Sequence, residues 1–140
     1  MPDLFAREHV LALLHQYTES EALRRHAYAV EAAMRLAAER TGHDPGLWGA
    51  AGLIHDFDYE RYPDMADHPF RGGEILRERG YPEDFVRDVM AHASHTGLPR
   101  ETELARWLFA VDELCGFCSA CAMVQPEREV AQVKETSGRK

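Results

Sequence analysis

The sequence predicts an all-α protein, a single bundle of about five to seven helices. Apolar residues recur at three- and four-residue spacing along nearly the whole chain, which is the pattern of helices that bury one face. Alternation of apolar and polar residues never persists for long enough to indicate a strand. Capping and turn residues then divide the chain into segments of helical length.

Asp3 is a candidate N-cap for a first helix over about 4–17. Its apolar positions are expected to face the core: Leu4, Val10, Leu11 and Leu14. A second helix is predicted over about 21–40, behind a cap at Thr18 or Ser20. Gly42 is expected to end it, because glycine readily takes the left-handed conformation that follows a helix.

A third helix should start at Asp44 and Pro45, where a capping acid precedes proline at the first helical position. It is expected to run to about His55 or Asp56. The polar, proline-containing stretch over about 58–65 is predicted to be a loop.

A fourth helix should open at His68–Pro69 and end near Gly80, and a fifth should run from Pro82 to about His92 or Ala93. After a break at about 96–99, a last long helix is expected over about 101–123. We assign residues 1–125 to one domain and residues 126–140 to a charged C-terminal tail.

A chain of 140 residues is long enough for one core but not for a second fold. Its net charge of -8 disfavours a general nucleic-acid binder, because a phosphate backbone needs a basic surface. A small phosphorylated substrate stays compatible with this charge, since metal ions and a few arginines can make a local positive pocket. Without a long apolar run or a signal-peptide pattern, we expect a cytoplasmic protein with no membrane partner; the oligomeric state stays open.

Four residues of metal-ligand type lie in apolar, helix-like segments: His26, the neighbours His55 and Asp56, and Asp112. An imidazole or carboxylate at an inward-facing position costs free energy unless something satisfies it, and one bound metal would satisfy all four. Nitrogen and oxygen ligands together suit Mn²⁺, Fe²⁺, Co²⁺, Ni²⁺ or Zn²⁺ better than Mg²⁺.

The order of these residues resembles the HD superfamily of metal-dependent phosphohydrolases: a lone His, a His-Asp pair after an apolar run, and a distant Asp inside a helix. Two further segments, 67–76 and 89–92, look like those that carry the extra histidines of HD proteins with more than one metal. The resemblance covers about residues 20–123 and is closest to small stand-alone proteins with a His-Asp-Ile-Gly turn, although Asp58 stands here in place of the glycine. The Gly-Tyr-Pro signature of the cyclic-dinucleotide phosphodiesterases is missing.

The resemblance implies that His26, His55, Asp56 and Asp112 bind a first ion and that Asp56, His68 and His92 hold a second. For the last two histidines, the alternatives are that His68 caps its helix and that His92 lies at the surface. In some of these families two consecutive histidines occupy the position of His92, whereas here Ala93 and Ser94 separate it from His95. The role of His95, as a spare ligand or as a substrate contact, therefore stays open.

Two ions roughly 3.5 to 4 Å apart can activate hydroxide for attack on a phosphoryl group, so we expect hydrolysis of a small phosphate ester, with a nucleotide as the expected substrate. Asp56 and Arg71 are the candidate catalytic residues. Arg25, Arg61 and Tyr62 are further candidates for phosphate contact, although each alone could simply be a solvated surface residue. Asp58 and Glu60 could orient a water molecule, but we expect them to be exposed to solvent.

Two other classes of function stay open. Some HD-fold proteins, including myo-inositol oxygenase, are di-iron oxygenases. A metal-stabilised regulatory module without turnover is the other alternative.

The cysteines Cys115, Cys118 and Cys121 resemble part of an iron–sulfur or zinc pattern, yet a fourth cysteine is absent and the segment is apolar. We therefore expect them to be small core residues. Most aromatic residues stand at apolar helix positions and are also expected in the core: Trp48, Phe57, Phe85, Trp107, Phe109 and Phe117.

Overall fold

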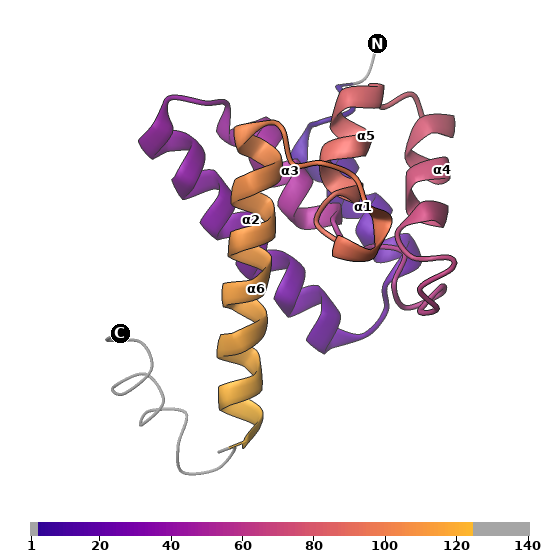
Figure 1. Cartoon of the computed structure of the whole chain (residues 1–140), viewed down its shortest axis with the longest axis vertical. Helices are drawn as coiled ribbons and strands as arrows, with labels where there is room; N and C mark the ends of the chain where they lie inside the picture. Colours follow the sequence, from indigo (N-terminus) through magenta and orange to yellow (C-terminus); the bar gives the residue numbers. More distant parts are fainter. Residues whose placement is uncertain (1–2, 125–140) are drawn as a thin grey trace.

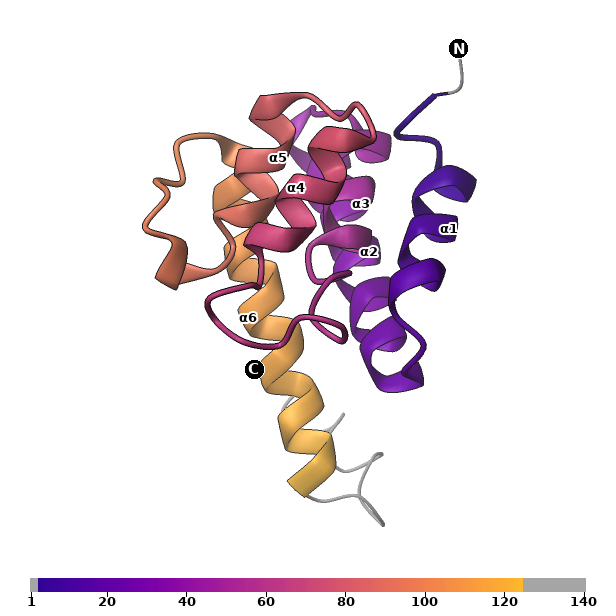
Figure 2. The same ribbon diagram turned by 90° about the vertical axis from the view of Figure 1, so that its right-hand side faces the viewer.

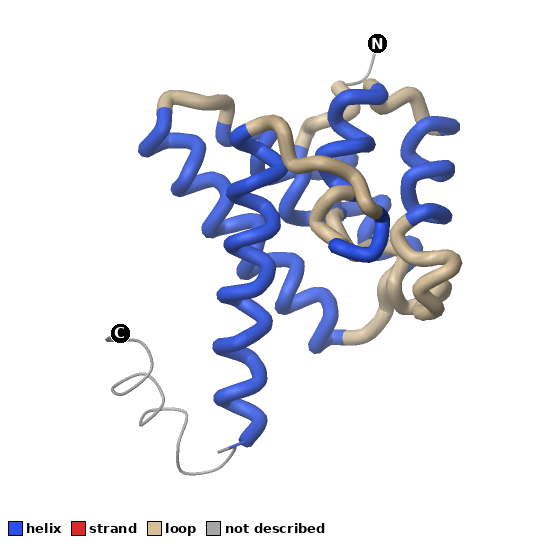
Figure 3. Tube along the Cα trace, viewed as in Figure 1, coloured by secondary structure: helices blue, strands red, loops and turns tan. Residues whose placement is uncertain are grey.

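The computed structural model describes residues 3–124, and the side chains of residues 3–116. Within this part the chain forms six α-helices, one short 3-10 helix and no strand (Figure 3). The prediction of an all-α bundle is confirmed. The elements are α1 (Arg7–Tyr17), α2 (Glu21–Thr41), α3 (Pro45–Ile54), α4 (Phe70–Glu78), α5 (Glu83–Met90), η1 (Ser94–Thr96) and α6 (Glu103–Val124).

Helix α3 occupies the centre of the bundle and packs against α1, α2, α5 and α6 (Figures 1 and 2). Every residue from Trp48 to Ile54 is buried, as expected of a helix that is apolar on all sides. A Cβ atom on Gly52 would lie 3.0 Å from backbone atoms of Val30 and Glu31, so the backbones of α2 and α3 are nearly in contact. The His55–Asp56 pair therefore follows directly after the buried central helix.

Helices α2 and α6 lie side by side and run in opposite directions (Figure 1). His26 near the start of α2 contacts Asp112 in the middle of α6, and His43 just after α2 lies 3.3 Å from Glu103 at the start of α6. On the other side of α3, α4 packs against α5, and α5 also contacts α6. None of the described helices is both long and apolar enough to cross a lipid bilayer.

The boundaries of α2 and α3 agree with the sequence prediction. The Ser20 hydroxyl accepts the Leu23 N–H at 3.3 Å, and Gly42 ends α2 with a φ of 80°. The Asp44 carboxylate accepts the Gly46 N–H at 2.9 Å and so begins α3. These hydrogen bonds join residues two or three positions apart, which explains why local sequence was sufficient to predict them.

The predicted start of α1 was wrong, because α1 begins at Arg7 with Ala6 as its N-cap. The Asp3 carboxylate instead accepts the N–H of Phe5 at 2.9 Å. Tyr81 donates its hydroxyl hydrogen to the Leu4 carbonyl at 2.7 Å, and the Phe5 ring packs edge-on against the ring of Tyr81. Contacts with a distant segment thus hold residues 4 and 5 in a turn outside the helix.

The end of α5 and the start of α6 each differ by about two residues from the sequence prediction. Helix α5 ends at Met90, just before the turn that carries His92, and α6 starts at Glu103, behind Thr102, whose hydroxyl accepts the Ala105 N–H at 3.0 Å. The prediction of a buried Trp107 was wrong, since it is 40% exposed. It lies about 100° around α6 from Leu108, which belongs to the buried face.

Candidate metal centre

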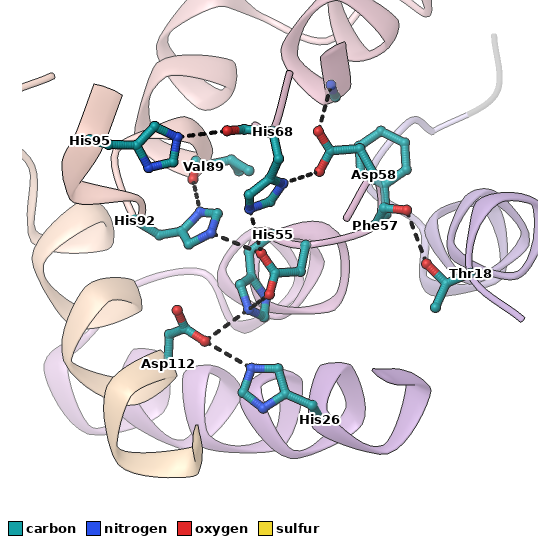
Figure 4. Close-up of polar contacts among 12 residues, drawn as sticks. Thr18, His26, His55, Phe57, Asp58, His68, Val89, His92, His95 and Asp112 are labelled. Carbon is teal, nitrogen blue, oxygen red and sulfur yellow. Dashed lines mark hydrogen bonds and ion pairs between the residues drawn. The ribbon is translucent and has the colours of Figure 1, made fainter. Parts of the chain in front are cut away.

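The four residues predicted to bind a first ion lie together at the junction of α2, α3 and α6 (Figure 4). Oδ1 of Asp112 lies 2.8 Å from Nε2 of His26 and 3.1 Å from Nε2 of His55. Oδ2 of Asp56 lies 3.5 Å from Nε2 of His55. All four ligand atoms lie within 4.8 Å of one another, so these residues could hold one metal ion.

The three residues predicted to hold a second ion form an adjacent group. Oδ1 of Asp56 lies 3.2 Å from Nε2 of His68 and 2.9 Å from Nε2 of His92. Both histidines are buried, so the alternative of a surface His92 was wrong. The alternative that His68 caps its helix was wrong as well, because Pro69 occupies the N-cap position of α4 and the His68 ring contacts Asp56 and Asp58.

Asp56 belongs to both groups, and its two oxygens face different histidines. Oδ2 is the oxygen near His55 and Oδ1 is the oxygen near His68 and His92. The geometry allows this carboxylate to face both groups, and its role as a bridge between two ions stays a prediction.

The hydrogen bonds of the Nδ1 atoms show that the donor set fits a cation. Nδ1 of His55 donates to the Gly52 carbonyl at 2.7 Å, and Nδ1 of His92 donates to the Val89 carbonyl at 2.6 Å. In a neutral ring the hydrogen is then on Nδ1, so Nε2 presents a lone pair to a carboxylate oxygen. Two electron-pair donors at this separation repel each other unless a proton or a metal ion lies between them, and a metal ligated by Nε2 uses this same Nδ1 arrangement.

In the metal-free protein a proton lies between the histidine Nε2 atom and the carboxylate oxygen. Burial disfavours the charged ring of His55, but the negative charges of Asp56 and Asp112 outweigh burial and raise the pKa of His55 to about 9. Burial acts in the same direction on His68, and its hydrogen bonds and ion pairs with Asp56 and Asp58 raise its pKa to about 9.

The pKa values of the two carboxylates, Asp56 and Asp112, shift downward. Burial would raise their pKa values, but the neighbouring histidines hold the pKa of both Asp56 and Asp112 well below the usual range. The ligand set therefore presents charged carboxylates that a divalent cation could neutralise.

Asp58 was expected to be exposed, and this prediction was wrong, because the residue is 1% exposed. Its Oδ1 accepts the Nδ1–H of His68 at 2.7 Å, and its Oδ2 accepts the N–H of Gly72 at 2.9 Å (Figure 4). The polar stretch after α3 folds against the start of α4, which buries the carboxylate. The pair Gly72-Gly73 was the sequence signal for this close approach, since glycine inside a helix often marks a place where another group comes near.

Two other residues secure the loop that carries the ligands. The hydroxyl of the buried Thr18 donates to the Phe57 carbonyl at 3.0 Å, a contact that the sequence analysis missed. Glu60 is exposed, as expected, and its carboxylate accepts the N–H of Ser20 at 2.8 Å. The turn after His55 is thus tied to the segment between α1 and α2.

The candidate phosphate contacts lie outside the two ligand groups. The Arg71 side chain is 54% exposed and pairs with Glu74 at 3.3 Å and with Asp67 at 3.7 Å. The Arg61 guanidinium donates to the Gln16 carbonyl at 2.9 Å, which directs it toward α1. Arg25 is exposed on α2, and Tyr62 lies under the Arg71 guanidinium at 6.0 Å. Their roles stay predictions.

His95 and Cys115 belong to neither ligand group. Nε2 of His95 donates to the carbonyl of His68 at 2.7 Å, so this ring supports the backbone of a ligand residue. Cys115 packs against the core, in agreement with the prediction for it, whereas the side chains of Cys118 and Cys121 lie outside the described residues.

The comparison with protein families agrees with the resemblance to HD proteins. Residues 23–116, more than half of the chain, match the HD domain family, and this range includes all six predicted ligand residues. Comparison with curated proteins and with solved structures gives no significant match. HD domains bind divalent metals and are generally metal-dependent phosphohydrolases. With its ordered histidines and aspartates gathered at one junction of a helical bundle, the chain belongs to the HD domain family.

Proposed function

We propose that this protein is a metal-dependent phosphohydrolase of a small phosphate ester, with a nucleotide as the expected substrate. The position of Asp56 between two ligand groups carries the proposal, because a carboxylate that belongs to both groups could serve a pair of neighbouring ions. Bound divalent ions would supply Lewis acidity toward the phosphoryl group and lower the pKa of a water molecule.

The chain itself supplies position and access. His55 is fully buried, whereas the side chains of Asp56, Asp112 and His26 are 27%, 22% and 18% exposed. One side of the ligand set is therefore open to solvent. An open side favours catalysis over a purely structural site, in which protein ligands close the coordination sphere.

We also propose that Arg71 contacts the phosphate of the substrate. It lies in the first turn of α4, three residues after His68. Its two ion pairs are between exposed groups of neighbouring turns, and such pairs contribute only about 0.2–1 kcal/mol. The guanidinium can exchange them for a phosphate, to which it can donate two parallel hydrogen bonds.

The test is hydrolysis by protein purified without chelator or histidine tag. We expect turnover of p-nitrophenyl phosphate or of its bis-ester with Mn²⁺, Co²⁺ or Ni²⁺, and loss of turnover with EDTA. These activated esters need few specific contacts, so the assay does not depend on the natural substrate. The Asp112→Ala variant is the control, because activity that persists in it would come from a contaminating phosphatase.

A metal-loaded protein that hydrolyses neither these esters nor a panel of nucleotides contradicts the proposal. Iron with a mixed-valent signal would then favour the oxygenase alternative. A full coordination sphere without an open position would favour a regulatory module.

A further inference from the structure

We propose that Asp58 is a positioning residue that holds His68 in the one tautomer able to bind the second ion. Asp58 would thus control loading of the second ion without affecting the first. The inference rests on the proposed two-ion site, and it concerns a residue that would itself touch neither ion nor substrate.

The acceptor of the Nδ1 hydrogen of His68 differs from the acceptors of His55 and His92. His55 and His92 each donate to a backbone carbonyl three residues earlier, so their orientation follows from local helical geometry. His68 donates to Asp58, ten residues away, and this is the one carboxylate among the three described Nδ1 acceptors. The Nδ1 hydrogen bond of His68 therefore depends on a single side chain.

The carboxylate of Asp58 serves two donors at once. Oδ1 accepts the Nδ1–H of His68, and Oδ2 accepts the N–H of Gly72 in the first turn of α4. Pro69, at the N-cap position, has a ring without an acceptor, so Asp58 satisfies a helix N-terminal amide from a different segment. Its negative charge also suits the positive end of the helix dipole.

An amide in place of this carboxylate cannot serve both donors, because asparagine offers one oxygen and one NH₂ group. If the NH₂ group faces Gly72, two donors meet. If it faces His68, Nδ1 must become the acceptor and the ring hydrogen moves to Nε2. That hydrogen then occupies the position where the second ion would bind. Asp58→Asn is therefore nearly isosteric but reverses the hydrogen-bond pattern.

The carboxylate of Asp58 packs closely against the first turn of α4. A Cβ atom on Gly72 would lie 2.8 Å from Cγ and 2.9 Å from Oδ2 of Asp58, and 3.1 Å from a ring carbon of Phe57. Glycine at position 72 is thus required by the close approach of α4. Gly72→Ala should displace the carboxylate while leaving its charge in place, and so provides a second, independent variant.

The experiment measures bound Mn²⁺ or Co²⁺ by elemental analysis and calorimetric titration. We expect two ions in the wild-type protein. Asp58→Asn and Gly72→Ala should keep the first ion at wild-type affinity and bind the second about 10- to 100-fold more weakly. The matched control is Asp64→Asn, the same change at an exposed position of the same loop, which should bind both ions as the wild type does.

The outcomes separate this inference from the proposed function. Two ions at wild-type affinity in Asp58→Asn overturn the positioning role. Loss of both ions from Asp58→Asn and Gly72→Ala, with a changed circular dichroism spectrum, also overturns it, because Asp58 would then support the fold as a whole. A single ion in the wild-type protein contradicts the two-ion site itself, and with it the proposed mechanism.

Discussion

Oδ1 of Asp112 lies 2.8 Å from Nε2 of His26, although 86 positions separate the two residues in the sequence. The pair joins the middle of α6 to the first half of α2. Because His55 at the end of α3 shares the same oxygen of Asp112, the ligand set connects three helices. A metal bound there would hold all three together.

Metal removal should therefore lower the stability of the fold. A ligand that binds only the folded state at about 100 times its dissociation constant stabilises it by about 2.7 kcal/mol. For a chain of this size that is a fall in Tm of about 10 °C. Thermal unfolding followed by circular dichroism, with EDTA and after addition of Mn²⁺, measures the effect. Asp112→Ala should show a smaller shift with metal, because it removes a ligand of the first group only, and a shift equal to that of the wild type would place the first ion elsewhere.

Asp56→Ala should lose metal more completely than His68→Ala. The oxygens of Asp56 face both ligand groups, whereas the Nε2 atom of His68 belongs to the second group only. We expect His68→Ala to retain the first ion and Asp56→Ala to lose the second ion and weaken the first. Elemental analysis of the two purified variants is the measurement. Equal and full occupancy in Asp56→Ala would remove this residue from the site.

Metal affinity should rise with pH up to about 9, because a metal must displace the protons that His55 and His68, with pKa values of about 9, hold in the metal-free protein. The stability of the metal-free protein should change in the opposite direction. The pKa of each ring is raised from 6.5, so its contribution is complete below pH 6.5 and is lost as the pH rises through about 9. Titration of Co²⁺ at several pH values and urea unfolding in EDTA measure the two trends. An affinity that does not depend on pH between 6.5 and 9 would contradict the assignment.

Arg71→Ala should weaken turnover without changing metal content. A hydrogen bond to a charged group contributes about 1.5–3 kcal/mol, so kcat/KM should fall about 10- to 100-fold. Arg77→Ala is a matched control, since this exposed arginine of the same helix pairs with Glu83. Equal kinetics of Arg71→Ala and the wild type would leave phosphate binding to other groups.

Two glycine substitutions should change stability in opposite directions. Alanine at Gly52 would place Cβ 3.0 Å from the backbone of α2, and overpacking of this kind costs about 1–3 kcal/mol. Gly116 in α6 has open space at this position, so alanine there should stabilise the helix by about 1 kcal/mol. Urea unfolding of both variants measures the difference. A neutral Gly52→Ala would mean that α2 and α3 can move apart without cost.

The helices and the types of the ligand residues could be predicted from sequence, because both depend on local patterns. The predicted starts of α2 and α3 were correct, because Ser20 and Asp44 accept hydrogen bonds from amides of their own helices. Inward-facing histidines and aspartates at apolar helix positions indicated a metal before any contact was known. The grouping of the residues into two sets came from the resemblance to the HD superfamily.

Contacts between distant segments decided the rest. Asp58 lies in a polar loop, and only the approach of α4 turns it into a buried partner of His68 and Gly72. The start of α1 shifted because Tyr81 binds the Leu4 carbonyl from 77 residues away. Sequence by itself thus determined which residues form helices and which side chains have the chemistry to bind a metal. The tertiary structure alone decided how those side chains are oriented, because the groups that orient them come from segments that meet only when the chain is folded.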